Sequence, residues 1–227
     1  MLVKIYGSAT YGVSAQTITI EVNIDQGVGY YLVGLPDNAI KESSHRISAA
    51  LKNTGFKLPG KKITINMAPA DLRKEGSSYD LTIAIGILAA SHQINAENIN
   101  DYIIMGELSL DGSLQPIKGV LPIALQAKQE GFKGIILPIQ NAKEAAIVNG
   151  IDVFGVGHIK EVIEFFDQNI PLAKLDLDIT KEFETNSNSF PFDFSEVKGQ
   201  ESAKRAIEIA AAGGHNIILI GPPGSGK

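Results

Sequence analysis

The sequence predicts an α/β (α+β) domain with helices stacked on a sheet, followed by a shorter C-terminal segment. Stretches with the period-2 pattern of strands alternate with stretches of helical composition up to about residue 168. From residue 169 onward this pattern gives way to Pro171, scattered acids and a run of Asn and Ser, which is typical of a linker. We therefore expect a domain at 1–168, a linker at 169–192 and a second segment at 193–227.

Composition limits the class of protein. The 227 residues are 44% hydrophobic, enough for a sizeable core, and the formal net charge of −5 argues against a surface dominated by nucleic-acid binding. Cys is absent, which excludes disulfides and fits a reducing cytoplasm. We find no signal peptide and no apolar run of the roughly 18 residues that a membrane span requires. The four histidines form no cluster, so no metal site is expected.

The first half of the chain is predicted to be rich in strands. The alternating pattern of residues 17–24 indicates a strand with one buried face, and residues 30–33 are expected to return as its hairpin partner. Asp37 or Asn38 is expected to cap a helix that ends at Gly55. Other strands are predicted at residues 2–5, where Gly7 ends the strand, and 62–67.

The second half is predicted to alternate between helices and strands. The helix that begins after Ser77 or Ser78, either of which can act as its N-cap, is apolar nearly all round and should lie in the centre. An Asp-Gly turn at residues 111–112 predicts a hairpin. Further strands are predicted at 102–105, 134–137 and 153–156, and further helices at 119–129, 142–148 and 159–166.

The last seven residues fit the phosphate-loop pattern G-x-x-x-x-G-K. In that pattern backbone N–H groups surround the phosphates of a nucleotide, and the lysine reaches the terminal phosphates. A helix predicted at 201–212 and a buried strand predicted at 217–220 precede the loop, in the order that this mechanism needs. The alternative is a glycine-rich surface turn. The predicted nucleotide-binding residues are Gly221, Pro222, Pro223, Gly224, Ser225, Gly226 and Lys227.

Residues 193–227 resemble the start of an AAA+ ATPase of the magnesium-chelatase-like group, and residues 1–168 resemble the amino-terminal domain of its YifB/ComM family. Three phrases carry the second resemblance: residues 34–37, 66–71 and 74–81. The resemblance implies that Val197, Gly199 and Gln200 lie near the adenine of a bound nucleotide.

For the intact protein, the same resemblance implies ATP and Mg²⁺ as cofactors and assembly into a homo-hexamer. It also implies a cytoplasmic DNA helicase for branch migration in recombination and natural transformation. The hydroxyl that binds Mg²⁺ in a phosphate loop would follow Lys227. We therefore expect these 227 residues alone to hydrolyse ATP weakly or not at all, and expect no metal site within them.

The first domain also resembles the proteolytic domain of Lon, within the ribosomal-protein-S5-domain-2-like fold. Ser78 matches the Lon nucleophile, and the position of the activating lysine falls on Ile123. A serine hydroxyl needs a neighbouring base, and losing a general base reduces the rate by roughly 10²–10⁴. Lys74 and Lys118 are the nearest substitutes, but neither is expected on the required helical face. We therefore expect no peptidase activity and interpret Ser78 as a helix cap.

Two other functions stay open beside the motor. An ATP-dependent Lon-like serine peptidase would use Ser78 and is disfavoured by Ile123. A magnesium-chelatase motor subunit is ranked last, because such subunits do not usually carry a Lon-like domain.

Several charged residues receive structural interpretations. Asp80, at the third helical position after the predicted N-cap, is expected to complement the dipole of its helix. A group of five cations is interpreted as solvated surface rather than as a nucleic-acid patch: Arg46, Lys61, Lys62, Arg73 and Lys74.

Overall fold

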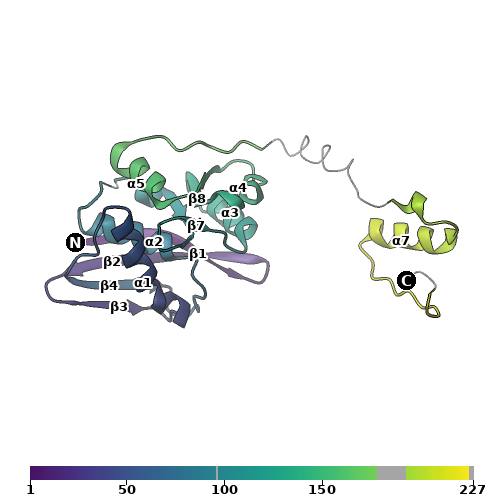
Figure 1. The fold of residues 1–227 in the computed structure, drawn as a ribbon, viewed down its shortest axis with the longest axis horizontal. Coiled ribbons are helices and arrows are strands. Elements are labelled where there is room, and N and C mark those ends of the chain that lie inside the picture. The colour runs from purple at the N-terminus through teal and green to yellow at the C-terminus, as the bar shows by residue number, and fades with distance from the viewer. Residues whose placement is uncertain (96, 178–192, 225–227) are drawn as a thin grey trace. The chain divides into compact units, whose positions relative to one another are not determined.

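The computed structural model describes residues 1–95, 97–177 and 193–224 (Figure 1). Contacts within the chain divide it into two units, Met1–Leu177 and Asp178–Lys227.

The N-terminal unit is built on one mixed sheet of seven strands in the order β3-β4-β2-β1-β5-β8-β9. The β1–β2 and β2–β4 pairs are antiparallel, whereas the other pairs are parallel. A separate two-stranded ribbon pairs β6 with β7. The bounds are β1 Leu2–Tyr11, β2 Ser14–Asp25, β3 Gly29–Val33, β4 Lys62–Ala68, β5 Tyr102–Ile104, β6 Glu107–Leu108, β7 Leu114–Gln115, β8 Gly134–Pro138 and β9 Asp152–Val156.

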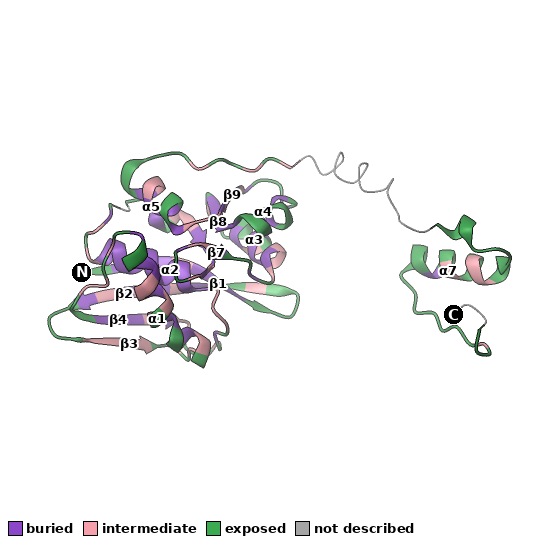
Figure 2. Cartoon of the chain, in the orientation of Figure 1, coloured by how far each residue is buried: buried purple, intermediate pink, exposed green. Residues whose placement is uncertain are grey.

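Helices join the parallel strands and cover the sheet (Figure 1). Helix α1 connects β3 to β4, because parallel neighbours need a crossover of this kind. Helix α2 is buried along its entire length (Figure 2), as its apolar sequence predicts. The bounds are α1 Asn38–Asn53, α2 Asp80–Ala90, α3 Val120–Gln129, α4 Ile139–Ala146 and α5 Ile159–Gln168, with a short 3-10 helix at Ile99–Asp101.

Several local predictions are confirmed. In β2 the side chains of Ile18, Ile20 and Val22 are fully buried, and burial of each such side chain contributes about 1.5–3 kcal/mol. The side chain of Asp37 caps α1 by accepting a hydrogen bond from the N–H of Ile40 at 2.9 Å. The Asp-Gly turn joins β6 to β7. The mixed α/β class that the sequence predicts is therefore the observed one.

Two strand predictions are wrong. Residues 30–33 do not form a hairpin with β2, because β4 lies between β2 and β3 and pairs with both. The first strand does not end at Gly7 either. It continues to Tyr11, since its whole length pairs with β2. In both cases the partner strand, which local sequence does not specify, decides the outcome.

The described part of the C-terminal unit contains a 3-10 turn, Phe194–Glu196, and helix α7, Glu201–Gly213. The predicted helix at 201–212 is confirmed. Residues 217–220 form no strand, which contradicts the prediction. A strand needs a hydrogen-bonded neighbour, and none of the described residues pairs with this segment, so Ile218 and Ile220 are exposed.

Candidate functional site

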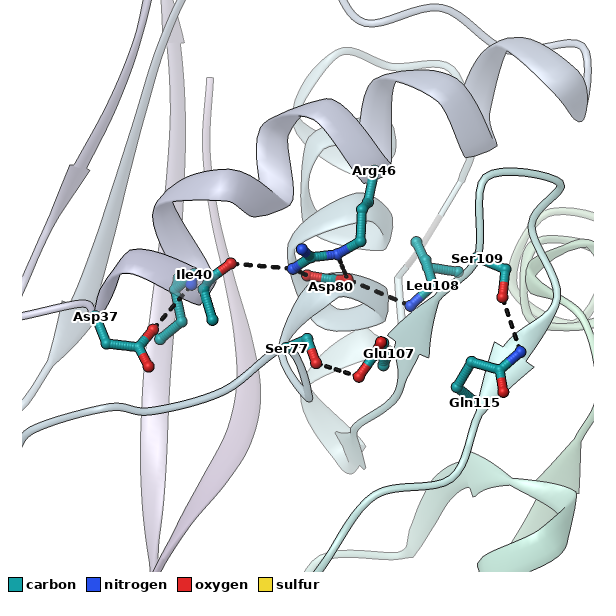
Figure 3. A network of polar contacts seen from close by, with 10 residues as sticks. Asp37, Ile40, Arg46, Ser77, Asp80, Glu107, Leu108, Ser109 and Gln115 are labelled. Atoms are coloured by element: carbon teal, nitrogen blue, oxygen red, sulfur yellow. Dashed lines mark hydrogen bonds and ion pairs between the residues drawn. The ribbon is translucent and has the colours of Figure 1, made fainter.

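A buried ion pair joins helix α1 to the first residue of helix α2 in the N-terminal unit. Two bonds join the guanidinium of Arg46 in α1 to the carboxylate of Asp80, Nε to Oδ2 at 2.6 Å and Nη2 to Oδ1 at 3.0 Å (Figure 3). The backbone N–H of Leu108 donates to the same carboxylate at 3.3 Å. Because Asp80 is only 1% exposed, this pairing compensates a charge that would otherwise be buried alone.

The environment acts on both partners of this pair. Burial raises the pKa of Asp80 above its usual value, while the hydrogen bonds from Arg46 and Leu108 oppose that rise. The hydrogen bond to Asp80 raises the pKa of Arg46 in turn. The interpretation of Arg46 as solvated surface is therefore wrong, because Arg46 pairs with a buried carboxylate. Asp80 stands in the first turn of α2, as the dipole interpretation expects, and it also pairs with this cation.

A second polar cluster joins residues 34–37 to residues 69–76. One carboxylate oxygen of Asp37 caps α1, and the other accepts the N–H of Gly76 at 2.9 Å. Lys74 is fully buried, and its ammonium donates to the carbonyl of Gly34 at 3.1 Å and to that of Pro69. Burial lowers the pKa of Lys74. The interpretation of Lys74 as solvated surface is thus wrong, and its ammonium holds two loops together instead of activating a serine.

Ser78 lines a cleft of about 500 Å³, called the Ser78 cleft below. Its backbone carbonyl accepts the N–H of Gly106 at 2.8 Å, which fixes the segment before α2. The predicted role of Ser77 or Ser78 as a helix cap is wrong, because Tyr79 takes the N-cap position without a side-chain hydrogen bond. The hydroxyl of Ser77 donates instead to the carboxylate of Glu107 (Figure 3).

The structure brings Ile123 and Lys118 into the Ser78 cleft. Ile123 lies on α3 and is 3% exposed, so it supplies hydrocarbon where the Lon resemblance requires a base. Lys118, one of the two lysines considered above as substitutes for the base, precedes α3 and also lines the cleft. Among the described residues, no hydrogen bond joins the Ser78 hydroxyl to an amine. In this geometry no base in the described part of the chain is therefore placed to take the proton of the Ser78 hydroxyl.

The C-terminal unit contains a cleft of about 320 Å³, called the C-terminal cleft below. It is lined by Val197 and Gln200 from the segment before α7, and by Gly221 and Pro222 from the glycine-rich loop. The side chains of Ile207 and Leu219 give it apolar walls. Such a lining fits a planar base, because aromatic rings bind favourably against apolar side chains.

The structure describes some of the remaining predicted nucleotide-binding residues and not others. Gly199 has a left-handed backbone with φ +72° and does not line the C-terminal cleft. Pro223 and Gly224 follow the lining residues directly and are exposed. Ser225, Gly226 and Lys227 lie outside the described residues. Their assignment to a nucleotide site stays a prediction.

Comparison with known sequences identifies the family. A family profile described as "Subunit ChlI of Mg-chelatase" matches residues 20–141, which is more than half of the chain. The chain belongs to this family. A second profile, "Magnesium chelatase, subunit ChlI", matches residues 193–227 and so covers the glycine-rich loop of this magnesium-chelatase family member.

Curated relatives match along both units. Competence protein ComM of Haemophilus influenzae is 43% identical across 100% of the chain, and YifB of Escherichia coli is 43% identical across 98%. Lon protease 2 of Bacillus subtilis is 32% identical over 63% of the chain and 26% of its own length. The chain spans 44% of the length of ComM and 43% of that of YifB.

Sequence reasoning missed the polar network because it treated each charge by itself. Asp80 immediately precedes eight consecutive residues of which seven are Leu, Ile, Ala or Thr, and a carboxylate beside so apolar a helix needs a buried cation. The Arg46 partner is 34 residues away, on another helix, so local pattern could not identify it. Among the described residues, no helix is both long and apolar enough to cross a membrane.

Proposed function

We propose that the chain is the amino-terminal part of an ATP-driven AAA+ motor, in which the N-terminal unit is a binding or assembly module without peptidase activity. The observation that carries the proposal is the C-terminal cleft, where residues 197 and 200 meet the glycine-rich loop. The magnesium-chelatase match over residues 193–227 supports it.

The proposed chemistry follows from these residues. Val197 and Ile207 offer apolar surface to the base, while the loop from Gly221 onward surrounds the phosphates with backbone N–H groups. Lys227 is proposed to reach the terminal phosphates. Mg²⁺, when bound with ATP, neutralises the charge that develops on the transferred phosphoryl group.

The substrate of the proposed motor is branched DNA. Similarity to the competence protein ComM supports this choice, together with a role in recombination and natural transformation. The intact protein is proposed to work in the cytoplasm as a homo-hexamer, as AAA+ motors commonly do. For the N-terminal unit, the proposal is a Lon-like, ribosomal-protein-S5-domain-2-like fold that has lost the hydrolytic chemistry.

Replacement of Lys227 tests the motor. In the full-length protein, Lys227→Ala is expected to lower ATP hydrolysis by about 10²-fold or more, because it removes a preorganised cation from the phosphates. Branch migration of a synthetic four-way junction should be lost in parallel. Lys198→Ala, which removes an exposed cation from the same unit, is the matched control and should leave both rates unchanged. Full ATP hydrolysis by the Lys227→Ala protein would refute the proposed nucleotide site.

The Lon-like peptidase is the second candidate, and the presence of Lys118 in the Ser78 cleft is the observation in its favour. We expect the full-length protein to leave casein intact in the presence of ATP, since Ile123 stands where a base is needed. Casein cleavage that disappears in both Ser78→Ala and Lys118→Ala would reverse this ranking. Cleavage unchanged by both substitutions would indicate a contaminating protease.

A further inference from the structure

A cleft of about 440 Å³ in the N-terminal unit is lined by three basic side chains. It lies where the end of α2 meets the loop between α1 and β4, and its ionisable side chains are Lys57, Lys61 and His92. No acid is among the described residues that line it. Because the whole chain carries more acids than bases, 25 against 20, a cleft with this lining is a local reversal of charge.

The two lysines of this cleft differ from other exposed lysines of the unit in their ion pairing. Elsewhere in the unit exposed lysines meet carboxylates, as Lys133 meets Asp101 at 2.5 Å and Lys174 meets Asp152 at 2.8 Å. Among the described residues, Lys57 and Lys61 have no such partner. The carboxylate of Asp25, beside the lining residue Ile24, accepts a bond from Asn23 at 2.6 Å. The ammonium groups are therefore available to an external anion.

His92 occupies a backbone conformation that favours glycine. Its φ is +58°, directly after the last turn of α2. The N–H groups of His92 and Gln93 donate to the carbonyls of Ala89 and Leu88 at 3.1 and 3.0 Å, which is the usual hydrogen-bond pattern at a helix end with a left-handed residue. A side chain adds some strain at that position, and the imidazole of His92 is exposed there at the rim of the cleft.

We propose that Lys57, Lys61 and His92 bind the phosphate groups of a single DNA strand. The inference rests on the proposed DNA-directed motor and adds a place where the N-terminal unit contacts the substrate. Lysine is a mobile point charge suited to phosphate, and the imidazole contributes an N–H donor. Leu58 and Pro59 give the cleft an apolar part that a deoxyribose ring can cover. The cleft volume lies in the range of about 300–1,000 Å³ typical of ligand sites.

Binding of a fluorescein-labelled thirty-nucleotide thymidine strand to the full-length protein tests the inference. In Lys57→Ala/Lys61→Ala the Kd at moderate salt should rise roughly tenfold. The slope of log K against log salt should become shallower by about 1.4, because each phosphate contact to single-stranded DNA contributes roughly 0.7. Lys128→Ala/Lys160→Ala, which removes two exposed lysines from α3 and α5, is the matched control and should bind like the unmodified protein.

His92→Gly separates binding from folding. The substitution should raise the Tm, because glycine relieves the left-handed strain, and should weaken strand binding in the same sample. A residue with only a structural role would not change these two quantities in opposite directions.

The binding measurements distinguish failure of this inference from failure of the proposed motor. A lysine double variant that binds the strand with an unchanged salt slope overturns this inference and leaves the motor intact. An unmodified protein that binds no DNA overturns both. Equal affinity for tripolyphosphate and for the strand would overturn the assignment to a nucleic acid.

Discussion

Arg46→Ala is expected to lower the free energy of unfolding by about 3–5 kcal/mol, because it leaves the carboxylate of Asp80 buried without its cation. The substitution also removes the hydrogen bond from Arg46 to the carbonyl of Ala39 at 3.0 Å. Urea denaturation followed by circular dichroism measures the change. The matched control is Arg73→Ala, which breaks an ion pair with Glu75 at 3.0 Å whose partners are 74% and 64% exposed. That pair should contribute less than about 1 kcal/mol.

The pH dependence of this loss has a definite sign. Without Arg46 the pKa of Asp80 rises further, since the contribution that lowers it is removed. A carboxyl whose pKa is higher in the folded state than in the unfolded state stabilises the fold only where it is protonated. The destabilisation by Arg46→Ala should therefore be smallest in acid and grow as the pH rises through the raised pKa of Asp80. A loss that is equal at pH 5 and pH 8 would contradict the assignment to a buried charge.

Gly34→Ala is expected to destabilise the N-terminal unit by at least about 3 kcal/mol. Gly34 has φ +99°, and a Cβ at this position would lie 2.1 Å from the carbonyl oxygen of Met67 and 2.8 Å from its carbonyl carbon. Both are backbone atoms of β4, so neither can move aside without disturbing the sheet. Thermal unfolding of the 227-residue chain measures the loss.

Gly55→Ala separates the collision from the backbone strain. Gly55 has a similar φ of +91°, but a Cβ there meets nothing within 4 Å. Its replacement should cost only about 1 kcal/mol. If Gly34→Ala and Gly55→Ala lower the Tm equally, the approach of residue 34 to β4 is looser than the structure indicates.

The sequence was sufficient to predict structure wherever that structure depends on residues close together in the chain. The period-2 pattern of residues 17–24, the Asp37 cap and the apolar α2 were all predicted correctly, since each depends on neighbours in sequence. The pairing of the strands was not predicted correctly, because it depends on residues far apart in the chain. The partner of β3 is a strand about thirty residues away, and the extent of β1 is set by β2.

The candidate sites divide in the same way. Ser78 and the glycine-rich loop are recognisable because each lies within one contiguous motif. Residues that meet from distant parts of the chain are not recognisable in this way: Lys118 lines the Ser78 cleft from a position forty residues further along the chain, and Arg46 pairs with Asp80 from α1. Lys74 is the clearest case of a residue whose environment the sequence alone does not reveal. A lysine in a polar loop looks solvated, and only the fold reveals the two carbonyls that bind it.

The position of β4 between β2 and β3 has a consequence for the nascent chain. Until residues 62–68 emerge from the ribosome, β3 has no neighbour in the sheet, and β2 can pair only with β1. During translation the segment at residues 30–33, Tyr-Tyr-Leu-Val, therefore stays unpaired. It remains so while the ribosome makes about thirty further residues. An unpaired strand of this kind is prone to aggregation until its partner is made.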